Sequence, residues 1–103
     1  MKICITAQGN TLDSQMELRF GRSPYFIIYD TETLEFEAIK NPNIEAANGV
    51  GIKSAQLMSD KNVQVLLTGK IGPKAADVLN TANIQVINSS AETVQEAITN
   101  YQA

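Results

Sequence analysis

The chain has 103 residues, 44% of them apolar, and eight basic and eleven acidic residues give it a net charge of −3. This length fits one domain, residues 1–103, with a single core, and the acidic balance argues against nucleic-acid or membrane-surface binding. The one cysteine, Cys4, excludes an internal disulfide. No apolar run is long enough for a signal peptide or a bilayer span, so we expect a cytoplasmic protein.

The first part of the chain predicts three strands. Residues 3–5 form a short apolar run typical of a strand that is buried on both faces. Residues 8–19 are polar and predict a long loop, and the aromatic and branched run 25–29 predicts the second strand. Residues 34–39 alternate apolar and acidic side chains. This alternation predicts a half-exposed edge strand that forms a hairpin with the second strand.

Helical and strand patterns alternate in the rest of the chain. Apolar and small side chains recur at helical spacing from residues 48–49 to a stop at Asn62, and residues 63–67 predict a buried strand. A tight loop, residues 68–73, leads into a helix with Pro73 at its first position and Asn83 at its end. Residues 84–87 predict a short strand.

The last predicted element is a helix that begins with the capping-box spacing of residues 93–96. The predicted order is therefore β-β-β-α-β-α-β-α. A hairpin followed by right-handed β-α-β units implies an α/β fold, with a mixed, mostly parallel sheet and helices on both faces.

The charges are distributed unevenly along the chain. Residues 30–45 hold five acids, whereas residues 46–76 hold four lysines and one acid. In an open sheet of this kind, ligands bind beyond the carboxyl ends of the parallel strands. Segments 7–22, 48–53 and 68–74 should meet there, and they bring glycines, two helix N-termini and five cations. Together these features predict an anion-binding site with a positive rim over a floor of backbone amides.

The residues predicted to bind the ligand are Arg19, Gly21, Arg22, Asn48, Gly49, Gly51, Lys53, Gly69, Lys70 and Gly72, and Lys74 is the fifth cation of the rim. Each has a simpler interpretation. The arginines could instead cap helices or pair with Asp13 and Glu17, and the glycines could serve only as turn residues. Cys4 fits a buried apolar thiol.

Several kinds of catalytic site are excluded by the residues present. The chain has no histidine, so it cannot form a Ser-His-Asp or Cys-His arrangement. It has too few Cys and His residues for a structural zinc site. The predicted central strands carry no carboxylate for two-metal catalysis, and segment 68–74 is not a P-loop. We therefore expect a binding protein, not an enzyme.

The motifs resemble those of the dinitrogenase iron–molybdenum cofactor biosynthesis family, which includes NifX- and NafY-like carriers and the C-terminal part of NifB. The similar pieces, in order, are MKI at 1–3, RFGRSPYF at 19–26, NP at 41–42, GVG at 49–51, TGKIGPKA at 68–75 and TVQEA at 93–97. The resemblance covers nearly the whole chain. It implies a ribonuclease-H-like three-layer fold with a five-stranded sheet in the order 3-2-1-4-5, without nuclease activity.

The resemblance also implies a function. It implies binding of an anionic metal–sulfur cluster, such as an iron–molybdenum cofactor, a precursor or a thiometallate. The protein would store this cluster or deliver it to other proteins. Many members have a histidine directly before Phe-Gly-Arg, whereas this chain has Arg19, which cannot coordinate a metal. We therefore predict no direct metal ligand. Arg19 and Arg22 would hold a labile cluster through charge-assisted hydrogen bonds.

Three functional hypotheses follow. The first is a non-enzymatic carrier for an anionic metal–sulfur cluster, with cluster-donor or acceptor proteins as partners. The second is a phosphate- or nucleotide-binding regulatory module, because the same backbone amides suit phosphate. The third is a scaffold protein whose acidic edge strand, residues 34–39, docks a partner, although charged edge strands usually serve to avoid pairing.

Overall fold

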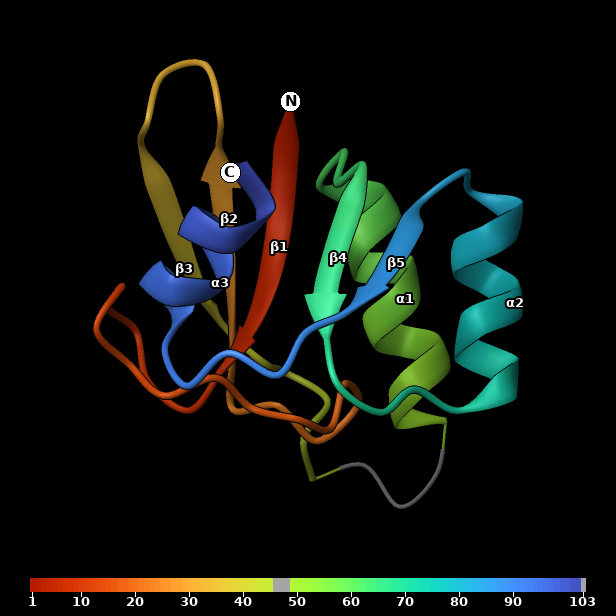
Figure 1. The fold of residues 1–103 in the computed structure, drawn as a ribbon. Coiled ribbons are helices and arrows are strands. Elements are labelled where there is room, and N and C mark those ends of the chain that lie inside the picture. The colour runs from red at the N-terminus through yellow and green to blue at the C-terminus, as the bar shows by residue number, and fades with distance from the viewer. Residues whose placement is uncertain (46–48, 103) are drawn as a thin grey trace.

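The structure is a computed structural model and describes residues 1–45 and 49–102. Its five strands form one sheet in the order β3-β2-β1-β4-β5 (Figure 1). The strands are β1 (Lys2–Ala7), β2 (Tyr25–Asp30), β3 (Phe36–Lys40), β4 (Val65–Thr68) and β5 (Gln85–Asn88), and the helices are α1 (Val50–Asp60), α2 (Pro73–Thr81) and α3 (Val94–Gln102). The predicted α/β class, strand order and mixed sheet are confirmed, and the arrangement is compatible with a ribonuclease-H-like fold.

The sheet separates two hydrophobic clusters because side chains alternate along each strand. On β1, Ile3 and Ile5 point into the cluster that α3 covers, whereas Cys4 points into the cluster beneath α1 and α2. The helices therefore lie on both faces, α1 and α2 on one and α3 on the other (Figure 1). No helix in the described part of the chain has both the length and the apolar composition needed to cross a membrane.

Two asparagines end α1 and α2 as predicted. Asn62 and Asn83 adopt left-handed backbone angles, with φ of 60° and 61°. After each of them, the next amide donates back into the helix, Val63 to the carbonyl of Met58 and Ile84 to that of Leu79. This pattern is the Schellman motif. The amides of residues 63 and 84 are therefore used to close helices, and β4 and β5 begin at Val65 and Gln85, later than predicted.

The β2–β3 hairpin corrects the prediction of a strand over residues 34–39. The Asp30 carboxylate accepts the Glu32 amide at 2.8 Å, and the Leu34 amide donates to the Asp30 carbonyl at 2.9 Å. This bonding makes residues 31–34 a turn, in which Leu34 has φ of 66° and is 63% exposed. The strand begins at Phe36, which is also exposed, and the edge position and antiparallel pairing with β2 are confirmed.

Strand directions give the sheet two different ends. β1 and β4 are parallel, so their carboxyl ends lie at the same end, together with the starts of α1 and α2. β2 runs antiparallel to β1, which puts the β2–β3 turn at the opposite end. Figure 1 shows this turn at the top and the starts of α1 and α2 at the bottom.

Candidate functional site

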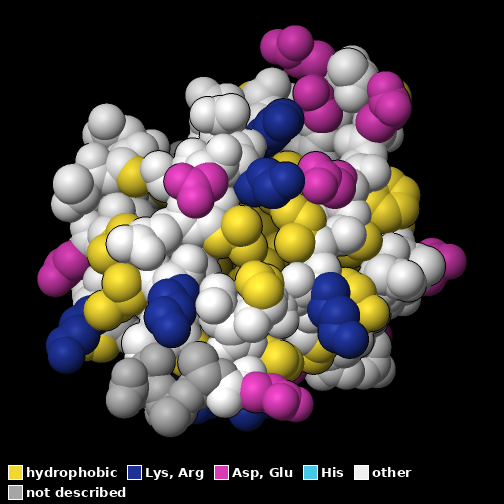
Figure 2. Space-filling view, turned by 180° about the vertical axis from the view of Figure 1, so that it is seen from behind, with side chains coloured by type: hydrophobic (Ala, Val, Ile, Leu, Met, Phe, Trp, Pro, Cys, Tyr) yellow, Lys and Arg dark blue, Asp and Glu magenta, His cyan; other side chains and the backbone are white. Residues whose placement is uncertain are grey.

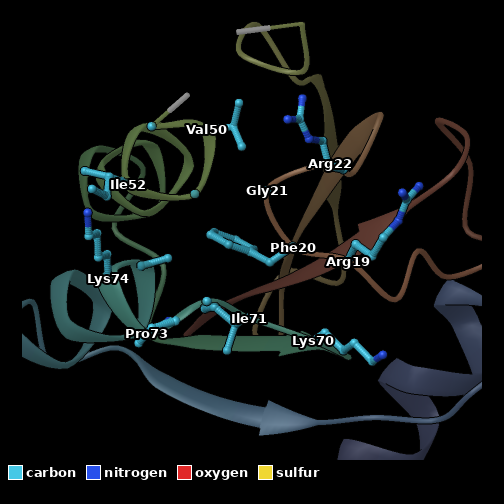
Figure 3. A pocket seen from close by; sticks show the side chains of 14 residues that line it. Arg19, Phe20, Gly21, Arg22, Val50, Ile52, Lys70, Ile71, Pro73 and Lys74 are labelled. Carbon is cyan, nitrogen blue, oxygen red and sulfur yellow. The ribbon is translucent and has the colours of Figure 1, made fainter. Parts of the chain in front are cut away.

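A cleft of about 650 Å³ lies at the carboxyl ends of β1 and β4. Three segments line it, namely residues 19–22 of the loop after β1, residues 49–52 at the start of α1, and residues 70–75, which lead into α2 (Figure 3). The segments near residues 20, 50 and 70 therefore converge, as the topology predicted. Clefts of this size bind small molecules and cofactors in other proteins.

The predicted binding residues fall into three groups. Seven of them line the cleft: Arg19, Gly21, Arg22, Gly49, Gly51, Lys70 and Gly72. Lys53 is exposed on α1 and Gly69 lies before the lining segment, so neither belongs to the wall. Asn48 lies outside the described residues. Lys74, the fifth predicted cation, also lines the cleft. That these residues bind a ligand stays a prediction.

Backbone pairing between the loop after β1 and the loop after β4 forms one wall. The Lys70 amide donates to the Leu18 carbonyl, and the Phe20 amide donates to the Lys70 carbonyl at 3.0 Å. Gly69 permits this approach, because a Cβ atom there would lie 2.5 Å from the Leu18 carbonyl oxygen. Gly69 is therefore needed to build the wall, although it does not itself face the cleft.

Two other glycines bring the remaining segments together. A Cβ atom on Gly21 would lie 3.2 Å from the Cα of Gly51, so the arginine loop can pack directly on the start of α1. A Cβ atom on Gly51 would lie 3.2 Å from the Cβ of Ala75, so α1 and α2 approach closely at their first turns. Both glycines therefore have packing roles, which differ from the turn roles that the simpler interpretation of the sequence gave to glycines.

The cations around the cleft are not equivalent. Arg19 donates from its backbone amide and from Nε to Oε2 of Glu17, at 3.0 and 3.2 Å, and the Glu17 side chain is only 9% exposed. The alternative pairing of Arg19 with Glu17 is thus confirmed. Arg22 donates from Nη1 to the Ile44 carbonyl at 2.8 Å, a neutral partner that leaves its charge unbalanced. Within the described residues, Arg22, Lys70 and Lys74 form no ion pair.

The centre of the cleft is apolar, which corrects the expectation of a floor made only of backbone amides. The apolar lining residues are Phe20, Val50, Ile52, Ile71, Pro73 and Ala75. Phe20 is only 1% exposed, and its ring lies 5.7 Å from that of Phe26 in the core. In Figure 3, Phe20 and Ile71 lie at the centre, while Arg19 and Lys70 extend to one side and Lys74 stands beside Ile52. The site therefore combines cations with an apolar surface.

Within residues 1–45 and 49–102, neither helix start at the cleft has a side-chain cap. Gly49 and Gly72 are the N-cap residues of α1 and α2, and neither provides a side-chain hydrogen bond to its helix. Neither first turn contains an acidic residue. The first amides of a helix have no partner within the helix and lie at the positive end of its dipole. Both starts are therefore suited to an anion in the cleft.

Cys4 does not contribute to the cleft. Its side chain is fully buried beneath α1 and α2, and burial raises the pKa of the thiol far above its usual range. The thiolate that would be needed as a metal ligand is therefore strongly disfavoured. Across residues 1–45 and 49–102, no group of three or more His, Cys, Asp or Glu side chains could hold a metal ion.

Two solved structures illustrate what this chain is similar to. The apo form of the orange protein from Desulfovibrio gigas has a TM-score of 0.93 and 35% identity, over 98% of this chain and 86% of that one. A putative NifB protein from Thermotoga has a TM-score of 0.87 and 37% identity, over the same shares of the two chains. No match is found among curated proteins. The family model described as dinitrogenase iron-molybdenum cofactor matches residues 1–103, and the chain belongs to this family.

Proposed function

We propose that this protein is a non-enzymatic carrier that binds an anionic metal–sulfur cluster in the cleft. The observation that carries the proposal is the combination of unpaired cations, two uncapped helix starts and an apolar centre in one cleft of about 650 Å³. Membership of the iron–molybdenum cofactor family supports the same class of ligand. Similarity to the apo form of the orange protein and to a putative NifB protein is consistent with it.

The mixed character of the cleft favours a sulfur-surfaced anion. An oxyanion is strongly hydrated, so placing it against the partly exposed side chains of Val50 and Ile71 has a high desolvation cost. Sulfide ligands spread the same charge over larger, more polarizable atoms that contact apolar side chains well. The cations and helix amides at the rim then balance the charge. Both parts of the lining are used by such a ligand, whereas a small oxyanion uses only the rim.

Binding through charge and hydrogen bonds fits the residues of the lining. None of the described lining residues is a cysteine or histidine, the side chains that usually bind metals in sulfur clusters. Among the described residues, Arg22, Lys70 and Lys74 have no carboxylate partner, so they are the main candidates for pairing with the cluster. Arg19 is already paired with Glu17 and contributes less. The expected complex is non-covalent and dissociates readily.

The experiment that tests the proposal uses tetrathiomolybdate as a defined probe. The purified chain is dialysed anaerobically to equilibrium against the probe, and the excess charge-transfer absorption on the protein side of the dialysis membrane is measured. Wild type should retain the probe. The single variants Arg22→Ala and Lys74→Ala should each weaken binding about tenfold, the usual scale for one charge-assisted hydrogen bond.

Lys53→Ala is the matched control, because it removes one exposed cation from α1 outside the cleft. It should bind like wild type. The paired change of Arg19 and Arg22 to alanine should abolish retention. Failure of wild type to retain the probe, or full retention by the paired variant, would contradict the carrier function.

The second candidate is a phosphate- or nucleotide-binding module, which the two uncapped helix starts favour. A comparison of molybdate with tetrathiomolybdate separates the candidates, since both are tetrahedral dianions and differ mainly in the atoms at their surface. The carrier should be stabilised against heat by the thio form only. Stabilisation by ATP and molybdate, without an effect of tetrathiomolybdate, would support the second candidate instead.

A further inference from the structure

One of the sequence motifs, Asn41-Pro42, does not line the cleft. Asn41 follows β3 directly, and its backbone amide donates to the Pro24 carbonyl at 2.9 Å. β3 runs in the same direction as β1, because both are antiparallel to β2, so Asn41 lies at the cleft end of the sheet. Asn41 is only 2% exposed. A buried side-chain amide needs hydrogen-bond partners, and these partners show what the residue does.

The side-chain amide of Asn41 holds the arginine loop. Its Nδ2 group donates to the Ser23 carbonyl at 2.9 Å and to the Gly21 carbonyl at 3.3 Å. Its Oδ1 atom accepts the Asn43 amide at 2.9 Å. These partners fix the orientation of the amide, because the reverse orientation would put an oxygen against two carbonyl oxygens. The two carbonyls belong to the residues on either side of Arg22, so Asn41 holds the backbone before and after this arginine.

The segment that Asn41 begins also holds the charged end of Arg22. Nη1 of Arg22 donates to the Ile44 carbonyl at 2.8 Å, and the bond from the Asn43 amide to Asn41 shapes the turn that leads to Ile44. Arg22 is therefore fixed at its backbone and at its guanidinium group by the same short segment, residues 41–44.

This support matters because Arg22 is an exposed rim residue of the cleft (Figure 3). A long exposed side chain without fixed contacts occupies many rotamers, and ordering it on binding costs conformational entropy. A side chain that is already held in place loses less entropy when a ligand binds. The contacts from residues 41–44 should therefore strengthen the interaction of Arg22 with an anion, although none of them involves the anion itself.

We infer that Asn41 is a positioning residue of the binding site, which acts by holding Arg22 in place at the rim of the cleft. The inference rests on the proposed function, since the ligand is taken to be the anion bound in that cleft. Asn41 makes no contact with the ligand, and its whole effect on binding passes through Arg22. Its hydrogen bonds also stabilise the fold, so a test must separate the two roles.

A double-mutant cycle separates them, with tetrathiomolybdate as the probe in anaerobic equilibrium dialysis. Asn41→Ala should bind the probe about tenfold more weakly than wild type, as Arg22→Ala does. If Asn41 acts through Arg22, the two losses do not add. The variant that combines both changes should therefore bind within about twofold of Arg22→Ala alone. Added salt should weaken binding less in Asn41→Ala than in wild type, because one charge contact is lost.

The effect on stability should follow a different pattern. Asn41→Ala leaves the Gly21 and Ser23 carbonyls without this donor, and should lower the melting temperature by about 5–10 °C with or without Arg22. Asn41→Ser is the milder variant, because its hydroxyl oxygen can still accept the Asn43 amide while the Nδ2 donors are gone. It should melt closer to wild type and show the same loss of binding and of salt dependence.

Asn83→Ala is the matched control for lost stability. Asn83 ends α2 with φ of 61°, away from the cleft, and alanine tolerates this conformation less well than asparagine. This variant should melt at a lower temperature and bind like wild type, with the same salt dependence.

Three results would overturn the inference while the proposed function stands. They are binding by Asn41→Ala within twofold of wild type, an equal loss with and without Arg22, and an equal loss in Asn83→Ala. If wild type itself does not bind the probe, the proposed function fails first and the inference fails with it.

Discussion

The two ends of the sheet differ in charge, in backbone conformation and in how their apolar side chains are used. At the cleft end, Phe20 is buried beneath cations and glycines. At the hairpin end, Leu34 and Phe36 are exposed beside the acidic residues of segment 30–37. Figure 2 shows acidic side chains gathered at the upper right of the molecule, the end where Figure 1 has the β2–β3 turn.

This difference explains how an acidic chain would present the anion site that we propose. Four of the eleven acids, Asp30, Glu32, Glu35 and Glu37, lie in the hairpin segment at the far end of the sheet, where Asp30 and Glu32 face the N-terminal amino group at 3.9 and 3.6 Å. Repulsion of an anion at the cleft is therefore weakened by distance and by screening. The net charge of −3 describes the whole molecule but neither of its ends. Three predictions test the contrast, from the largest expected effect to the smallest.

The two ends should differ most in what an aromatic side chain contributes to stability. Phe20→Ala removes a side chain that is 1% exposed and should lower the free energy of unfolding by about 3–5 kcal/mol. Phe36→Ala removes one that is 42% exposed and should cost less than about 1 kcal/mol. Urea unfolding of both variants measures the contrast. Equal losses would show that the Phe20 ring is not part of the core.

Each end also contains a residue with left-handed backbone angles, and their replacements should act in opposite directions. Gly49→Ala puts a Cβ atom at φ of 73° and should destabilise the fold by about 1 kcal/mol. Leu34→Gly removes a Cβ atom from a residue with φ of 66° and should stabilise the fold by about 0.5 kcal/mol. Little packing is lost, because the leucine side chain is exposed. Thermal unfolding checks the signs. Destabilisation by both changes would mean that Leu34 packs more tightly than its exposure indicates.

The smallest expected effect concerns the pH dependence of the hairpin end. The hydrogen bond from the Glu32 amide is the main cause that lowers the pKa of Asp30. A lowered pKa means that the folded state binds this proton less readily than the unfolded state. The contribution to stability is therefore complete above the ordinary pKa of the carboxyl group. It is lost as the pH falls through the lowered value.

Asp30→Asn should accordingly be less stable than wild type at neutral pH and approach it in acid. Urea midpoints measured from neutral pH downward test this expectation. If the urea midpoints of Asp30→Asn and wild type still differ as much at the lowest pH as at neutral pH, the charge of Asp30 is not what stabilises the turn. Glu92→Gln changes an exposed carboxylate far along the chain and serves as the control. The urea midpoint of this variant should differ little from that of wild type at every pH.

Much of the fold could be predicted from local patterns. Asn62 and Asn83 ended helices as expected because asparagine tolerates the left-handed conformation that the helix closure needs. Pro73 took the first helical position for a similarly local reason. Leu34 was misassigned because its place in the turn depends on hydrogen bonds to Asp30, and alternation of apolar and acidic residues does not reveal them.

The site was predictable in its location and less so in its chemistry. Topology and the positions of cations and glycines were enough to bring segments near residues 20, 50 and 70 together. The apolar centre was missed because Phe20 lies in a polar stretch of sequence and becomes buried only through tertiary contacts. Lys53, which the sequence predicts as a binding residue, does not line the cleft, because helix periodicity alone does not show on which side of α1 it projects.

The burial of Cys4 has a consequence for how a carrier of this kind would be emptied. Metal–sulfur centres often move between proteins by stepwise replacement of one thiolate by another, and this chain's single thiol is out of reach in the interior. Unloading of such a carrier would proceed by simple dissociation or by capture by a competing receptor. The lifetime of the loaded state would then depend on ionic strength and on the acceptor's concentration, and the thiol redox poise of the surroundings would have little direct influence on it.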